Sequence, residues 1–169
     1  MSGPLPPEND LWLFARQFYA EPGVAEACLA LQDNLGVDVC LVLYLLHLAL
    51  TRRSVMAATV AEMAAAALPW RESVVVPLRL VRRGLRQPPP GYAGAAALRT
   101  SIAAIEIEAE RMQLAFLGAL DVTAHPAATP LAAARDNLAA YCEVLGRPRE
   151  SMDQVLAHFG EYHRGHPAE

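Results

Sequence analysis

The sequence predicts an all-α protein: a single compact bundle of seven or eight helices around a buried central helix at about residues 38–51. Through most of the chain, apolar residues recur at three- and four-residue spacing, which is typical of amphipathic helices. No two-residue turn joins alternating segments into a hairpin, and the β-branched cluster SVVVP at 73–77 lies within a helical pattern. A length of 169 residues suits one domain, with short flexible ends at about 1–8 and 164–169.

Two helices with clear capping residues are expected before the central one. The first covers about Asp10 to Ala20, with Asn9 or Asp10 as its N-cap. The second begins near Pro22, which suits a first helical turn, and ends at Gly36, which suits a C-terminal cap. The apolar stripe of the first helix, which should face the core, consists of Leu11, Phe14, Ala15 and Phe18.

The central helix is the apolar segment from Val39 to Leu50. It is shorter than the stretch of about 20 residues that a membrane span needs, so we expect a buried core helix and no membrane insertion. Asp38 falls at its N-terminus, where a carboxylate accepts backbone N–H bonds. Asp33 falls in the last turn of the preceding helix, where the helix dipole disfavours its charge. It therefore needs a neighbouring N–H group or an arginine as a partner.

The fourth and fifth helices are marked by serine and proline. The fourth follows Ser54, which we expect to cap it, and ends at Pro69. The fifth, WRESVVVPLRLVRRGLR at 70–86, is amphipathic, and Pro77 should kink or divide it because proline removes a backbone donor. Its apolar flank, which we expect to face the core, consists of Val74, Leu78, Val81 and Leu85, and its opposite flank of Arg79, Arg82 and Arg86.

Three further helices complete the predicted bundle. One covers about 95–120, and two shorter helices follow at about 130–145 and 151–162. The stripe of the first, which should also face the core, consists of Ile102, Ile105, Ala109, Met112 and Phe116.

Arginines on and near the fifth helix are the strongest charge feature of the sequence: Arg71, Arg79, Arg82, Arg83 and Arg86, with Arg52 and Arg53. The planar guanidinium suits three roles: internal pairing, binding of an acidic protein or phosphorylated ligand, and nucleic-acid binding. A formal net charge of -4 argues against a general binder of nucleic acid. We favour internal pairing with Asp33, Asp38 or the glutamates of the sixth helix. In particular we expect Arg79 to pair with Asp33 or Asp38, which leaves Arg82 and Arg86 available for a partner.

The candidate polar site therefore consists of Asp33, Asp38, Arg79 and Arg82, with Trp12, Tyr44, His47, Trp70 and Arg86 as secondary candidates. The stripe Cys40, Tyr44, His47 and Thr51 either lines a pocket or faces a neighbouring helix. Cys40 and His47 lie about 10 Å apart along a helix, so one metal ion cannot bind both. The histidines near the C-terminus lack a firm metal-ligand pattern, and no phosphate- or dinucleotide-binding glycine pattern occurs. We expect no metal and no cofactor.

Composition indicates the partners and the cellular location that we expect for the protein. Hydrophobic residues make up 54% of the chain and charged residues 19%, against about 25% in typical proteins. Apolar surface should therefore be hidden by a protein partner or a homo-oligomer. Three cysteines without a CxxC pair suit reduced, buried thiols, and the first ten residues have no signal-peptide pattern. A cytoplasmic location follows as an expectation.

The first half of the chain carries a pattern of residues that is also found elsewhere: Leu11, Trp12, Phe14, Tyr19, Pro22, Gly23, Val24, Cys28, Leu29, Leu31, Gln32, Asp33, Gly36 and Asp38, then Trp70, Pro77, Leu78 and Arg79. In this pattern the chain resembles a proteobacterial family, domain-of-unknown-function family 2390. The resemblance implies a small helical bacterial protein and no particular activity. We therefore expect a non-catalytic protein-binding or adaptor module. The alternative is an enzyme or small-ligand carrier that uses the acids of the 33–38 junction and the arginines. A flat exposed apolar patch in the structure would favour the first reading, and a deep pocket that contains these groups would favour the second.

Overall fold

Helices are the dominant elements in the described part of the chain, where two strands of two residues each are the other elements, which confirms the all-α prediction. The structure is a computed structural model that describes residues 9–166. The elements in chain order are α1 (Asp10–Tyr19), α2 (Val24–Leu35), α3 (Val39–Leu50), β1 (Arg53–Ser54), α4 (Ala57–Trp70), the π-helix η1 (Arg71–Val75), α5 (Val76–Gly84), α6 (Ala95–Gly118), β2 (His125–Pro126), α7 (Pro130–Leu145), the 3-10 helix η2 (Arg149–Met152) and α8 (Asp153–Gly165). The predicted flexible end at 1–8 lies outside the described residues, as do residues 167–169 of the other.

Helix α3 is the centre of the fold, as predicted, because its residues are apolar on nearly every side. The Leu45 and Leu46 side chains are fully buried, and α3 packs against α7, α6 and α1. Asn137 of α7, also fully buried, donates its amide hydrogens to the carbonyl oxygens of Leu45 and Arg53 at 3.0 Å. This side chain fixes the start of β1 against the core. No helix in residues 9–166 is long and apolar enough to cross a membrane.

Three predicted caps are confirmed at the ends of α1, α2 and α3. The Asn9 side chain accepts a backbone N–H bond from the first turn of α1 at 2.9 Å. Gly36 ends α2 with φ +68°, a left-handed conformation that glycine adopts without strain. The Asp38 carboxylate accepts the N–H groups of Cys40 and Leu41, at 3.0 and 3.4 Å. These contacts fix the short junction between α2 and α3.

Two predicted helix starts are wrong. Helix α2 begins at Val24, and Pro22 lies outside it because a turn through Gly23, with φ +83°, precedes the helix. Helix α4 begins at Ala57, and Ser54 belongs instead to the two-residue pair of β1 with β2. The Ser54 hydroxyl lies 3.3 Å from a carboxylate oxygen of α7, so a tertiary contact replaces the expected capping role.

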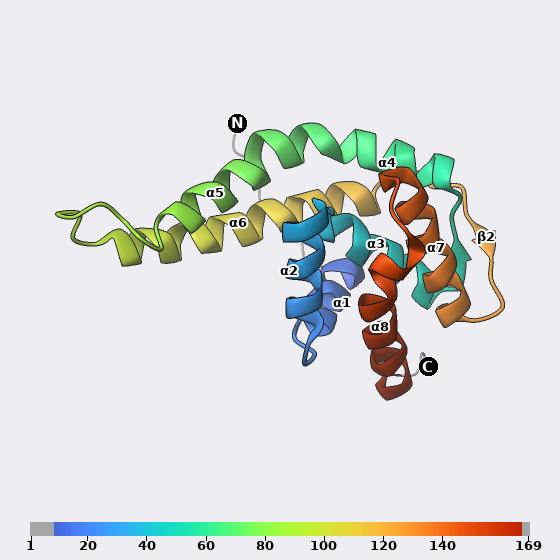
Figure 1. Cartoon of the computed structure of the whole chain (residues 1–169). Coiled ribbons are helices and arrows are strands. Elements are labelled where there is room, and N and C mark those ends of the chain that lie inside the picture. The colour runs from blue at the N-terminus through green and yellow to red at the C-terminus, as the bar shows by residue number, and fades with distance from the viewer. Residues whose placement is uncertain (1–8, 167–169) are drawn as a thin grey trace.

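Helices α4 and α5 follow one another as a single long rod through η1, with α6 alongside it (Figure 1). Pro69 does not end α4 as predicted, since the helix continues to Trp70 and into η1, where the Ser73 hydroxyl donates to the Pro69 carbonyl oxygen at 2.6 Å. Pro77 falls in the first turn of α5, where its missing N–H is tolerated. The segment 70–86 is therefore divided, as predicted, but the division is the π-helix η1, which lies between Pro69 and Pro77.

The orientation of α5 and α6 agrees with the prediction only in part, since Val74, Leu78 and Leu85 of the expected core flank are half-buried. Helix α5 has no buried residue, Val81 is exposed, and the flank with Arg79 and Arg82 faces α6. In α6 the expected core residues Ile105, Met112 and Phe116 are exposed and Ile102 is half-buried, whereas Ala109 is buried as predicted. The other buried positions of α6 are Ala95, Glu106, Gln113, Leu114 and Leu117. The cause is the arm that α5 and the first half of α6 form beyond the other helices (Figure 1). Within this arm the two helices pair their charged flanks with each other.

Candidate functional site

A cavity of about 710 Å³ lies between the α5–α6 arm and helices α1, α2 and α3. Its volume is in the range of about 300–1,000 Å³ that small-molecule sites occupy. Leu29 and Ile107, which are exposed to solvent, belong to its wall, so their exposure is inside a concave surface. The apolar part of the lining consists of Trp12, Ala15, Tyr19, Ala20, Leu29, Val39, Leu43, Val75, Ala103, Ile107 and Leu114.

Charged side chains from α1, η1, α5, α6 and the α2–α3 junction complete the lining. Among the described residues, five arginines and three carboxylates contribute, so the lining has a formal excess of two positive charges when all are ionised. The arginines are Arg16, Arg71, Arg79, Arg82 and Arg99, and the carboxylates are Asp38, Glu106 and Glu110.

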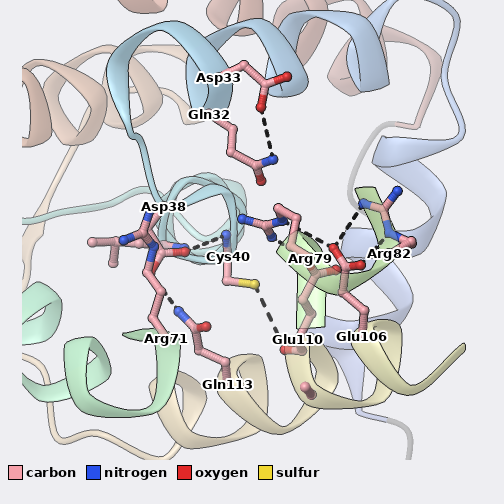
Figure 2. A network of polar contacts seen from close by, with 12 residues as sticks. Gln32, Asp33, Asp38, Cys40, Arg71, Arg79, Arg82, Glu106, Glu110 and Gln113 are labelled. Carbon is pink, nitrogen blue, oxygen red and sulfur yellow. Dashed lines mark hydrogen bonds and ion pairs between the residues drawn. The ribbon is translucent and has the colours of Figure 1, made fainter. Parts of the chain in front are cut away.

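Arg79 is the centre of the ion-pair network in this cavity (Figure 2). Its Nε lies 3.1 Å from Glu106 Oε1 and its Nη2 lies 2.7 Å from Glu110 Oε1. Arg82 binds both oxygens of Glu106 through Nε and Nη2. Burial alone would raise the pKa of Glu106, but the hydrogen bonds from the two arginines outweigh it and hold the pKa below its usual value. For Glu110 burial dominates and raises the pKa.

Asp38 forms a second polar group on the other side of Cys40 (Figure 2). Besides capping α3, its Oδ2 accepts a hydrogen bond from Gln113 Nε2 at 2.6 Å and lies 3.8 Å from Arg71 Nε. Tyr141 Oη accepts the Asp38 backbone N–H at 3.0 Å. Burial raises the pKa of the carboxyl in spite of these contacts. The last residue of the junction is thus held by α6, α7 and η1 together.

The predicted pairing of Arg79 with Asp33 or Asp38 is wrong. Arg79 binds the glutamates of α6, while Asp33 forms an ion pair with Arg83 at the surface. The antiparallel arm places residue 79 opposite residues 106 and 110, and residue 83 is turned toward Asp33 at the end of α2. Arg71, Arg79, Arg82 and Arg83 pair internally, as predicted for the arginines. The expectation that Arg82 is available for a partner is wrong, because Glu106 binds it. The Arg79 side chain is, as predicted, less exposed, at 12%, than Arg82, at 19%, or the exposed Arg86.

The secondary candidates are not gathered at one place. Trp12 lines the cavity, whereas Trp70 lies behind α6 and donates its indole N–H to the Ala109 carbonyl oxygen at 3.0 Å. Tyr44 is buried outside the lining, and the His47 ring packs 5.7 Å from the Phe14 ring. Burial lowers the pKa of His47. Of the predicted stripe on α3, which also includes Thr51, Cys40 is the member that reaches the cavity.

Glu106, Glu110, Gln113 and Arg99 belong to the site but not to the predicted candidate set, although the glutamates of the sixth helix were expected as partners of the arginines. A signal for the first two was present, because Glu106 and Glu110 are spaced i, i+4 and Arg79 and Arg82 are spaced i, i+3. Two helices joined by a short proline-rich connection lie antiparallel, so such flanks of opposite charge meet. Gln113 and Arg99 had no comparable signal.

The thiols of the protein are poor nucleophiles and poor metal ligands. Cys28, Cys40 and Cys142 are free and buried, as predicted. Burial raises the pKa of Cys28 to about 12 and raises that of Cys40 well above its usual value. The part of the chain that the structure describes has no group of three histidine, cysteine or acidic side chains placed to hold a metal ion.

The cavity lies within the part of the chain that matches a protein-family model. Residues 10–117 match the model of a family described as protein of unknown function (DUF2390). No curated protein and no solved structure matches the chain. Every lining residue of the cavity, from Trp12 to Leu114, lies inside the matched region.

Proposed function

The chain belongs to the DUF2390 family of proteins of unknown function, and we propose that it is a non-catalytic carrier that binds a small organic molecule in the cavity beside the α5–α6 arm. The observation that carries this proposal is a cavity of about 710 Å³ that combines apolar walls with an arginine-rich polar side. Such concave, mostly apolar sites with a few convergent polar groups are typical of ligand binding. The bacterial origin and the cytoplasmic location stay predictions.

Binding is favoured over catalysis by the state of the reactive groups. The Cys40 thiol has a strongly raised pKa and is directed to the Glu110 carbonyl oxygen at 3.9 Å, so it is not an activated nucleophile. Asp38 caps a helix, and Glu106 and Glu110 are held by arginines. Groups that are fixed in this way orient a ligand well but have little freedom to transfer protons.

The proposal is tested by filling the cavity. Ala103 lines it, and its neighbour Ala104 is exposed on another side of the same helix. We expect Ala103→Phe to weaken binding of the fluorescent probe 1-anilinonaphthalene-8-sulfonate by about tenfold or more, because the ring occupies ligand space. Ala104→Phe is the matched control and should bind the probe like the wild type. Equal affinities of all three proteins in a fluorescence titration would refute the proposal.

A second function, protein binding, is supported by a different surface. Leu98, Ile105 and Met112 recur every seven residues along α6 and are exposed, and Phe116 extends the row. A seven-residue apolar row is typical of helix–helix contacts between chains. Sedimentation of the wild type and Ile105→Glu over a range of concentrations tests a homo-oligomer. A wild-type protein that stays monomeric throughout would contradict self-association.

A further inference from the structure

Arg99 differs from the other arginines that line the cavity. Its Nε is buried and has no hydrogen-bond partner, and no carboxylate among the described residues forms an ion pair with it. Arg79 and Arg82 are already neutralised by Glu106 and Glu110, and Arg71 donates to the Gly36 carbonyl oxygen at 3.0 Å. Arg99 as a whole is half-buried, and a guanidinium that lines a cavity without a carboxylate partner leaves its charge uncompensated there. Arg99 therefore marks the place where an acceptor from outside the chain fits.

The surroundings of Arg99 define the rest of that molecule. Ala103, Ile107 and Leu114 follow Arg99 on the same face of α6, at separations of four, four and seven residues, and all of them line the cavity. Trp12 and Leu29 form apolar wall on the side of α1 and α2. A positive charge at one position is thus followed along the helix by apolar surface.

The polar lining also excludes some ligands. A cation would need an unpaired carboxylate, but Glu106 is bound by two arginines, Glu110 by one, and Asp38 by Gln113 and the N-terminus of α3. A neutral apolar molecule would leave the Arg99 donor buried and unpaired. A single anionic group satisfies it, because the guanidinium fork matches both carboxylate and phosphate oxygens.

We propose that the ligand is an anionic amphipath whose one carboxylate or phosphate group pairs with Arg99 while its apolar body lies along Ala103 and Ile107 against Trp12. This assignment rests on the proposed carrier function. It makes Arg99 the residue that selects for charge, whereas the network around Arg79 holds the shape of the cavity.

The test compares three probes with the same apolar chain: decanoate, decyl phosphate and decan-1-ol. Isothermal titration is carried out on the wild type, on Arg99→Gln, and on Arg86→Gln, which removes an exposed arginine outside the cavity and is the matched control. We expect the wild type and the control to bind decanoate or decyl phosphate about tenfold or more tightly than the alcohol. Arg99→Gln should lose this preference and bind the alcohol like the wild type. The stronger of the two acids identifies the head group.

Two results would overturn the assignment. If Arg99→Gln binds the acids as tightly as the wild type does, or if the wild type binds the alcohol as tightly as the acids, Arg99 does not select an anion and the carrier function still stands. If none of the three probes binds the wild type, the carrier function fails together with the assignment.

Discussion

Removal of the Arg79 side chain should destabilise the fold much more than removal of an exposed arginine, because Arg79 belongs to an internal ion-pair network. In the Arg79→Ala variant Glu110 loses its arginine partner among the described residues, while Glu106 keeps Arg82. Breaking a buried ion pair typically costs about 3–5 kcal/mol, because the remaining charge is left without compensation.

The size of the loss follows from exposure. The side chains of Arg79 and Glu106 are 12% and 7% exposed, but that of Glu110 is 31% exposed, so water partly compensates its charge. We therefore expect the free energy of unfolding to fall by about 2–3 kcal/mol, below the range for a fully buried pair. Arg86 is exposed and outside this network, and Arg86→Ala should change the free energy by less than about 0.5 kcal/mol.

The pH dependence of this loss of stability is a second, independent test of the prediction. Burial already raises the pKa of Glu110, and loss of Arg79 raises it further because Arg79 lowers it. The ionised Glu110 then destabilises the variant above the pKa of the unfolded chain, and protonation relieves this at lower pH. Urea denaturation followed by circular dichroism should thus show a loss that is largest at neutral pH and smaller in acid. Equal, small losses for both alanine variants, or a loss that grows in acid, would refute the reasoning.

Three further predictions concern stability. Leu45 is fully buried and Leu80 is 62% exposed. Leu45→Ala should therefore lower the free energy of unfolding by about 2–5 kcal/mol, and Leu80→Ala by less than about 0.5 kcal/mol. Equal thermal midpoints of the two variants would contradict the central position of α3. Asp38→Ala should lower the free energy of unfolding in urea by at least about 1–2 kcal/mol, because α3 loses its cap. Asp38→Asn keeps a capping side chain and should lower it less. An equal loss in both variants would mean that the charge of Asp38, and not its capping bonds, stabilises the fold. The pKa of Glu106 is lowered on folding, so its stabilising effect is present above the pKa of the unfolded chain and is lost as the pH falls through the folded value. The thermal midpoint should accordingly fall less steeply in acid for Glu106→Gln than for the wild type, and parallel curves would count against the network.

The start of α1, the end of α2 and the start of α3 could be predicted closely because these limits depend on local chemistry. Asn9, Gly36 and Asp38 act on backbone groups within a few residues, so the sequence contains the cause and the effect together. The central position of α3 also followed directly, since a helix that is apolar on nearly every side has to be buried.

The orientation of α5 and α6 could not be predicted from the periodicity of each helix alone. An amphipathic pattern gives two flanks, but it does not state which flank meets a neighbour. In the arm, Arg79 and Arg82 meet Glu106 and Glu110, and this mutual neutralisation turns apolar side chains such as Ile105 outward. The tertiary pairing of two helices decided the outcome.

The candidate site was therefore predicted in part. Asp38, Arg79, Arg82 and Trp12 do line one cavity, but the cavity itself depends on how far the arm stands from α1 and α2, which no local pattern encodes. Arg99 could not be predicted for the same reason. From the sequence, an arginine near the start of a helix is expected to be solvated, and its place in the cavity depends on α1 and α2 on the opposite side.

The central claim, that the cavity and not the apolar row on α6 is the ligand site, is tested most directly by methyl nuclear magnetic resonance during a titration with decanoate. Leu43 and Ile107 line the cavity, whereas Leu98, Ile105 and Met112 form the exposed row. We expect the methyl signals of Leu43 and Ile107 to shift and saturate together while those of Leu98 and Met112 stay in place. Shifts confined to the row on α6, or no shift at Leu43 and Ile107, would contradict the claim.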